Sequence, residues 1–131
     1  MNIPAGFHTL NPYMFIDNAD DYLVFLKQGL GADEMHCSRR EDGKIANAQL
    51  RIGNSMIMLS ESTADFPSMC SAYYLFVEDA RASMEQAQQS GAEVIMEVAD
   101  MPYGDRQGGV RDSAGNIWWI SQRLSNEPYD T

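Results

Sequence analysis

The stretch Tyr13–Gly31, YMFIDNADDYLVFLKQGLG, decides the fold because the chain repeats its pattern in the second half. There, Leu75–Ala80 (LFVEDA) has the same order of apolar and polar residue types as Met14–Ala19 (MFIDNA). We call the offset from Met14 to Leu75 the repeat spacing. In both copies a strand-like run leads into a helical pattern, which closes on Gly-Ala-acid at Gly31 and again at Gly91. A repeat of this kind predicts two similar structural units in tandem.

Residue periodicity predicts the order βαβββ for each unit. Asn18 and Asp79 are the expected helix N-caps, and Gly29 or Gly31 is expected to end the first helix. In the first half we expect a strand at 10–16, a helix up to Gly29 or Gly31, and strands at 33–39, 45–52 and 55–60, with a hairpin turn at 41–44. In the second half we expect a strand at 72–77, a helix at 80–90 and a strand at 93–98. A further strand should follow the loop at 100–105 and end at Val110, and the last strand should span 117–122.

Composition places the chain among ordinary globular proteins. It has 131 residues, of which 44% are hydrophobic and 21% charged. No apolar run approaches the roughly 20 residues of a membrane span, and the N-terminal residues MNIPAGFHTL lack the pattern of a secretory signal. Cys37 and Cys70 form no metal or redox spacing. We therefore expect a cytoplasmic protein with reduced thiols, which neither spans nor binds a membrane.

The formal net charge of −10 argues against a nucleic-acid partner, because binding to phosphates needs Lys and Arg. An acidic surface mainly promotes solubility. It would also favour a cationic ligand through long-range steering.

Four stretches carry a family resemblance. They are Gly6–Tyr13, Gly43–Ile45 leading to Leu50–Gly53, Tyr103–Arg106 (YGDR) and Asp112–Trp118 (DSAGNIW). Over about Phe7 to Gln122 the chain resembles the vicinal oxygen chelate superfamily, in its small bacterial glyoxalase and bleomycin-resistance-like branch. The resemblance implies an α+β fold of two βαβββ modules, whose concave mixed sheets form a ligand cavity, usually in a homodimer. It predicts one domain over 1–131, with modules at about 7–60 and 72–123, a linker at 61–71 and a polar tail at 124–131.

The resemblance also locates the positions where metal-using members carry their ligands. These positions fall at Asn11 and Met58 in the first half and, one repeat spacing later, at Ala72 and Trp119. A catalytic divalent ion needs about three carboxylate or imidazole ligands, and this set offers none. We therefore expect no metal and no cofactor.

Titratable groups are also missing from other familiar places. Relatives often carry His and Glu in the third strand, where this chain has Asn47 and Gln49. His8 and His36 match no catalytic spacing, and we expect them to be satisfied by backbone groups. Neighbouring His36 and Cys37 should point to opposite faces of a strand. These departures favour binding over catalysis.

The loop Tyr103-Gly104-Asp105-Arg106 has two interpretations. Asp105 and Arg106 could form an ion pair that anchors the loop, which we favour. Alternatively, Arg106 could face the cavity and bind a carboxylate or phosphate.

Period-two alternation places Tyr13 and Phe15 on one strand face and Tyr74 and Phe76 on the corresponding face of the second half, with Met58 and Trp119 lining the same cavities. Core packing and a stacking platform for a flat guest fit these residues equally well.

The function we predict is metal-independent binding of a small hydrophobic or aromatic molecule, as in drug sequestration by antibiotic-resistance proteins. The alternative is a metal-independent enzyme, such as a lyase or isomerase, that acts on a small metabolite or natural product. The predicted ligand-binding residues are Asn11, Tyr13, Asn47, Gln49, Met58, Tyr74, Tyr103, Arg106 and Trp119.

Overall fold

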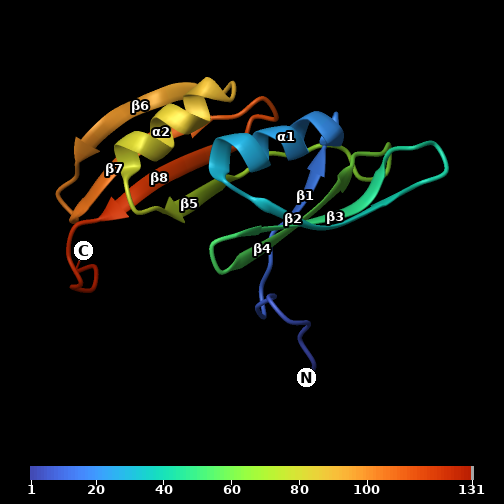
Figure 1. Ribbon diagram of the computed structural model, residues 1–131, viewed down its shortest axis with the longest axis horizontal. Helices are drawn as coiled ribbons and strands as arrows, with labels where there is room; N and C mark the ends of the chain where they lie inside the picture. The colour runs from blue at the N-terminus through green and yellow to red at the C-terminus, as the bar shows by residue number, and fades with distance from the viewer. Residues whose placement is uncertain (131) are drawn as a thin grey trace. The chain divides into compact units, whose positions relative to one another are not determined.

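The computed structural model describes residues 1–130, and Thr131, the last residue of the expected tail, lies outside that range. The chain divides into two compact units, Met1–Met69 and a second that begins at Cys70. Each unit has one helix and one four-stranded sheet, as the repeat predicts (Figure 1). No helix of the described chain is long and apolar enough to cross a membrane.

The first unit contains β1 (Tyr13–Ile16), α1 (Ala19–Leu30), β2 (Asp33–Arg39), β3 (Ile45–Ile52) and β4 (Ser55–Glu61). The second contains β5 (Ala72–Phe76), α2 (Ala80–Gln89), β6 (Glu93–Asp100), β7 (Asp105–Arg111) and β8 (Ile117–Arg123). The strand orders are β1-β4-β3-β2 and β5-β8-β7-β6. The first strand of each unit lies parallel to the last, and the other pairs are antiparallel. The βαβββ prediction is confirmed for both halves.

Strand register reproduces the sequence repeat. Tyr13 of β1 pairs with Met58 of β4, and Tyr74 of β5 pairs with Trp119 of β8. Tyr74 and Trp119 follow their counterparts Tyr13 and Met58 by the repeat spacing. The two units therefore place equivalent residues at equivalent points of their sheets.

One face of each sheet packs against its helix. In β1, Met14 and Ile16 are buried, while Tyr13 is exposed and Phe15 half-buried. Leu59 is buried beside them, and Tyr22 and Leu26 of α1 complete this core. Because side chains alternate along a strand, Tyr13 and Phe15 lie on the opposite face, as predicted. We call the face away from the helix the concave face of each unit.

The start of α1 differs from the prediction. Asn18 has φ 59° and its side chain makes no capping hydrogen bond. Instead the Glu61 carboxylate accepts from the backbone N–H groups of Asn18 and Ala19, both at 2.9 Å. A long-range carboxylate thus replaces the local cap. The end of α1 is as predicted, with Gly31 at φ 72°.

The second helix uses both kinds of cap. Asp79 caps α2 locally by accepting from Ala82 N at 3.1 Å, which confirms the prediction. Gln122 Oε1 also accepts from Ala80 N at 3.1 Å. Gln122 is the counterpart of Glu61 in the repeat, so in both units the last strand holds the first turn of the helix.

The first strand is shorter than predicted. It begins at Tyr13 because Asn11 turns back to His8, through Nδ2 to the His8 carbonyl (2.6 Å) and from the His8 N–H to Oδ1 (2.9 Å). Strands β2 and β3 have the predicted bounds, and the turn between them is confirmed, with Gly43 at φ 84°.

The segment after β4 is folded back onto the first unit. Glu61, expected in the linker, is the last residue of β4. The Asp17 carboxylate accepts hydrogen bonds from the Ser62 and Ser68 hydroxyls, and Thr63 N–H donates to the Phe66 carbonyl at 2.9 Å. These bonds hold Phe66 over β1, where its ring stacks on Phe15.

We predict that Glu61→Ala lowers the free energy of unfolding by about 1 kcal/mol, because two amides at the start of α1 lose their acceptor. Urea denaturation monitored by circular dichroism measures the change. Glu41→Ala, in the exposed hairpin turn, is the control and should have little effect. Equal effects of the two substitutions would contradict the assigned cap.

Candidate functional site: two aromatic concave faces

A row of side chains crosses the concave face of the first unit. Gln49 of β3 pairs with Met58 of β4, which pairs with Tyr13 of β1. Asn47 shares this face, because Gln49 Nε2 donates to Asn47 Oδ1 at 3.0 Å. The structure thus brings together four of the predicted ligand-binding residues.

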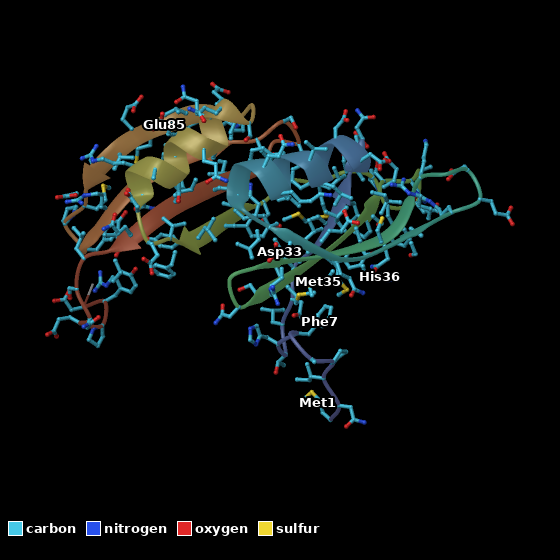
Figure 2. All side chains as sticks on the ribbon, in the orientation of Figure 1. Met1, Phe7, Asp33, Met35, His36 and Glu85 are labelled. Atoms are coloured by element: carbon cyan, nitrogen blue, oxygen red, sulfur yellow. The ribbon has the colours of Figure 1, made fainter. Side chains whose placement is uncertain are left out.

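His36 extends the same row on the edge strand β2, where it pairs with Gln49. Figure 2 labels His36 on this strand. We expected both histidines to be satisfied by backbone. This is confirmed for His8, whose Nε2 lies 2.8 Å from the Asn54 carbonyl oxygen. The His36 imidazole is exposed and has no hydrogen-bond partner within residues 1–130. His36 therefore adds to this row an imidazole that no other described residue hydrogen-bonds.

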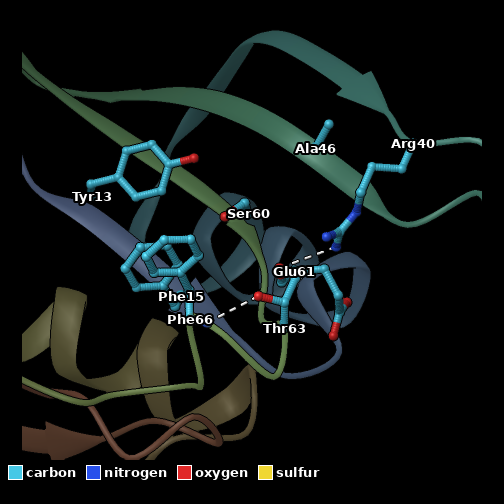
Figure 3. Close-up of a pocket in the computed structure, with 8 residues that line it drawn as sticks. All are labelled: Tyr13, Phe15, Arg40, Ala46, Ser60, Glu61, Thr63 and Phe66. Atoms are coloured by element: carbon cyan, nitrogen blue, oxygen red, sulfur yellow. Dashed lines mark hydrogen bonds between the residues drawn. The ribbon is translucent and has the colours of Figure 1, made fainter.

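A cavity of about 430 Å³ lies beside this row (Figure 3). The stacked rings of Phe15 and Phe66 form one wall, with centroids 5.4 Å apart and planes at 15°, and Tyr13 contacts Phe15 at 5.4 Å. The eight lining residues are Tyr13, Phe15, Arg40, Ala46, Ser60, Glu61, Thr63 and Phe66. Ala46 reaches the cavity because β3 has an extra residue there, between the partners of Ser38 and Arg39.

Asn11, another predicted ligand-binding residue, forms its side-chain hydrogen bonds outside this row. Its side-chain amide bonds the His8 backbone, in the segment that precedes β1. Both ends of the amide are therefore occupied by the N-terminal arm.

The concave face of the second unit is more aromatic. Tyr74, Tyr103 and Trp119, all predicted ligand-binding residues, line a cavity of about 310 Å³ together with Met96 and Gln107. The Tyr103 hydroxyl donates to Gln107 Oε1. The structure thus brings three more predicted residues together, in the second unit.

Two glycines make room on the two faces of β7. A Cβ at Gly109 would lie 2.5 Å from the Trp119 ring, so the indole packs directly against the strand backbone. A Cβ at Gly108 would lie 2.7 Å from Met84 of α2. Gly109 therefore determines how far Trp119 projects from the sheet.

Asp105 is the polar centre of the second unit and is fully buried. Its carboxylate accepts hydrogen bonds from the hydroxyls of Tyr74 and Tyr129 and from Arg123 Nη1 (3.0 Å). Arg123 also lies 4.1 Å from the centroid of the Tyr129 ring, a cation–π contact. The C-terminal segment through Tyr129, which belongs to the expected polar tail, is therefore bound to the core of the unit.

The predicted Asp105–Arg106 pair is wrong. Neighbouring residues of a strand point to opposite faces, so Arg106 turns away from Asp105. It pairs with Asp100, its register partner on β6, with 2.8 Å between Nε and Oδ1. Arg106 thus anchors the β6–β7 hairpin, and the anchoring partner is Asp100.

The surroundings of Asp105 and Tyr74 determine their protonation. Burial opposes ionisation of Asp105, but hydrogen bonds from Tyr129, Tyr74 and Arg123 outweigh it and hold its pKa below the ordinary value. Burial and the adjacent Asp105 carboxylate raise the pKa of Tyr74 far above its ordinary value. Tyr74 therefore stays a neutral hydrogen-bond donor near neutral pH.

The residues at the family's metal positions do not fit a metal. Within residues 1–130, no group of three His, Cys, Asp or Glu side chains could hold an ion. In the first unit Asn11 bonds His8 and Met58 offers only a thioether. In the second unit Ala72 and Trp119 offer no ligand atom.

Sequence reasoning missed five residues of these sites, namely Arg40, Phe66, Asp105 (as a buried acceptor), Arg123 and Tyr129. Phe66 carried a usable signal, because an aromatic residue in a polar linker needs a surface to cover. Arg40 and Tyr129 carried no such signal, because hairpin and tail positions are normally solvated.

We predict that Gly109→Ala lowers the free energy of unfolding by about 1–3 kcal/mol, because the new methyl group displaces the Trp119 indole. Urea denaturation of Gly109→Ala, Trp119→Ala and the double variant measures the coupling. The penalty should shrink in the Trp119→Ala background. An unchanged penalty would show that the indole does not lie against Gly109.

We predict that Asp105 makes the protein acid-sensitive. Because its pKa is lower in the folded than in the unfolded state, its stabilisation is present above the unfolded pKa of about 3.9 and is lost as pH falls through the folded value. Urea denaturation between pH 7 and pH 3 should therefore show a steeper loss for the wild type than for Asp105→Asn. Parallel profiles would contradict this role, and Tyr129→Phe provides a milder variant.

Comparison with known proteins places this geometry in a family. The family model described as the glyoxalase/bleomycin resistance protein/dioxygenase superfamily matches residues 7–120. An uncharacterized Mycobacterium bovis protein, Mb0911c, is 30% identical over 127 residues, covering 86% of this chain and 82% of its own. The uncharacterized Mycobacterium tuberculosis protein Rv0887c is also 30% identical over 127 residues, and the match covers 86% of this chain and 73% of Rv0887c.

Two solved structures show the same fold. TioX from Micromonospora sp. ML1 aligns with a TM-score of 0.72 at 19% identity, covering 92% of this chain and 100% of its own. TnmS3, an antibiotic binding protein from Streptomyces sp. CB03234, aligns with a TM-score of 0.71 at 19% identity, and the alignment covers 94% of this chain and 98% of TnmS3. The chain belongs to the glyoxalase/bleomycin resistance protein/dioxygenase superfamily.

Proposed function

We propose that this protein reversibly binds a small, planar aromatic molecule without a metal ion, and so sequesters it. The observation that carries the proposal is the repeated cross-strand pair, Tyr13 with Met58 and Tyr74 with Trp119. Large apolar side chains occupy the same point of both concave faces, each beside a cavity in or near the usual size range for small ligands, roughly 300–1,000 Å³.

The polar groups of these faces suit binding. Asn47 and Gln49 are neutral amides that can orient a ligand but cannot transfer protons near neutral pH. Asp105 is occupied by three donors, and Tyr74 remains protonated. The antibiotic-binding role of TnmS3, which shares this fold, is consistent with the same use of the scaffold.

A metal-independent enzyme remains the second candidate because of His36. Its free imidazole lies in the cross-strand row with Gln49 and Met58, where it could act as a general base. That function predicts chemical change of the bound molecule, and loss of this change in His36→Gln.

The proposal includes a homodimer, as is usual in this family. Light scattering coupled to gel filtration gives the subunit number, and a monomer at micromolar concentration would contradict this part.

We predict that 9-anthracenemethanol, a neutral planar probe, binds with saturable affinity and is recovered unchanged. Anthracene fluorescence anisotropy measures binding, and chromatography of the released probe measures turnover. Phe15→Ala and Trp119→Ala test the two faces, and affinity should weaken in at least one. Val24→Ala, on the exposed side of α1, is the control.

Absence of binding would contradict the proposed function. Conversion of the probe would favour the enzyme instead.

A further inference from the structure

We infer that the cavity of the first unit recognises an aromatic ligand that bears one carboxylate, which is bound by Arg40. This inference rests on the proposed function and names the ligand class that the first concave face selects. It depends on the position of the Arg40 guanidinium, on its lack of a counter-charge and on the aromatic wall across from it.

Arg40 is held at the cavity by the backbone. Its Nη2 donates to the Glu61 carbonyl at 3.1 Å, and its side chain lines the same space as Phe15 and Phe66. Figure 3 shows the guanidinium directed toward Glu61, with the two stacked rings on the other side of the cavity. One end of the site is therefore cationic and the other aromatic.

The charge of Arg40 has no counter-ion in the described chain. Arg39, Arg51, Arg106, Arg111 and Arg123 each form an ion pair, whereas the half-buried Arg40 and the exposed Arg81 form none with residues 1–130. Its Nε is buried without a hydrogen-bond acceptor. A half-buried guanidinium with one carbonyl partner retains donors for an added anion.

Glu61 also lines the cavity, but its carboxylate is already used. Both of its oxygens accept from the first amides of α1, at 2.9 Å. It therefore does not neutralise Arg40 directly, yet its charge disfavours a dianion nearby. A single carboxylate balances the single guanidinium better than a phosphate would.

The aromatic wall suits the rest of such a ligand. Phe66 is 59% exposed although it stacks on Phe15, so part of its ring remains available for a further contact. The Ser60 and Thr63 hydroxyls lie between wall and cation and can orient polar substituents. An aromatic carboxylic acid fits this arrangement, because its ring can contact the aromatic wall while its carboxylate reaches Arg40. The net charge of −10 would by itself favour a cation, so the preference for an anion is local to Arg40.

The test compares two probes that share one ring system, anthracene-9-carboxylate and 9-anthracenemethanol, by fluorescence anisotropy at pH 7.5. The wild type should bind the carboxylate about tenfold more tightly, the gain of one charge-assisted hydrogen bond. Arg40→Met should abolish this preference, because the affinity for the carboxylate should fall to about that for the alcohol. Arg39→Met is the matched control, because Arg39 pairs with Asp20 at 2.7 Å, and it should retain the preference.

Circular dichroism establishes that each variant is folded. If Arg40→Met does not fold, Arg40→Lys keeps the test decisive, because a single ammonium group should reduce the preference without abolishing it.

Equal affinity of the wild type for the two probes would overturn the inference while leaving the proposed function in place. A preference that survives in Arg40→Met, or that disappears equally in Arg39→Met, would also overturn it. Binding of neither probe would overturn the inference and the proposed function together.

Discussion

The hydrogen bonds from the first amides of each helix to the last strand of the same unit are the constraint on which this structure depends. Glu61 and Gln122 occupy equivalent positions of the repeat, and so do Ala19 and Ala80, whose amides they hold. In the first unit, β4 lies parallel to β1, so one side chain joins the end of β4 to the start of α1. This joint holds the start of α1 at the end of β4, while burial of Met14 and Ile16 determines which face of β1 meets the helix. The opposite face, with Tyr13 and Phe15, is thereby left for the cavity.

The repeat made much of this predictable. Register at Tyr13–Met58 and Tyr74–Trp119 follows from one spacing, and alternation assigns the faces because a strand has period two. Contacts between distant residues were not predictable, since local propensity carries no information about them. Asn18 is a favourable cap by residue type, but its positive φ and the reach of Glu61 decide otherwise.

Asp105 shows the same limit in the candidate site. Its sequence neighbour Arg106 was the natural partner to expect, yet the strand turns the two side chains apart. The partners it has are Tyr74, Arg123 and Tyr129, and they come from the first strand, the last strand and the tail of the unit. Only the closed fold brings them together, and burial then makes an acceptor with several donors necessary.

These internal partnerships decide which chemistry remains for a ligand. The side-chain oxygens of Asp105 and Glu61 already accept hydrogen bonds from the protein itself, so neither is a ready proton acceptor. Trp119 lies against Gly109 at a position where metal-using relatives place a ligand, and it presents an aromatic surface there. What the concave faces offer is therefore ring surface, neutral amides and, in the first unit, a guanidinium without a counter-ion and an imidazole without a hydrogen-bond partner among residues 1–130. A set of this kind distinguishes ligands by shape and charge, and a binding protein needs no more.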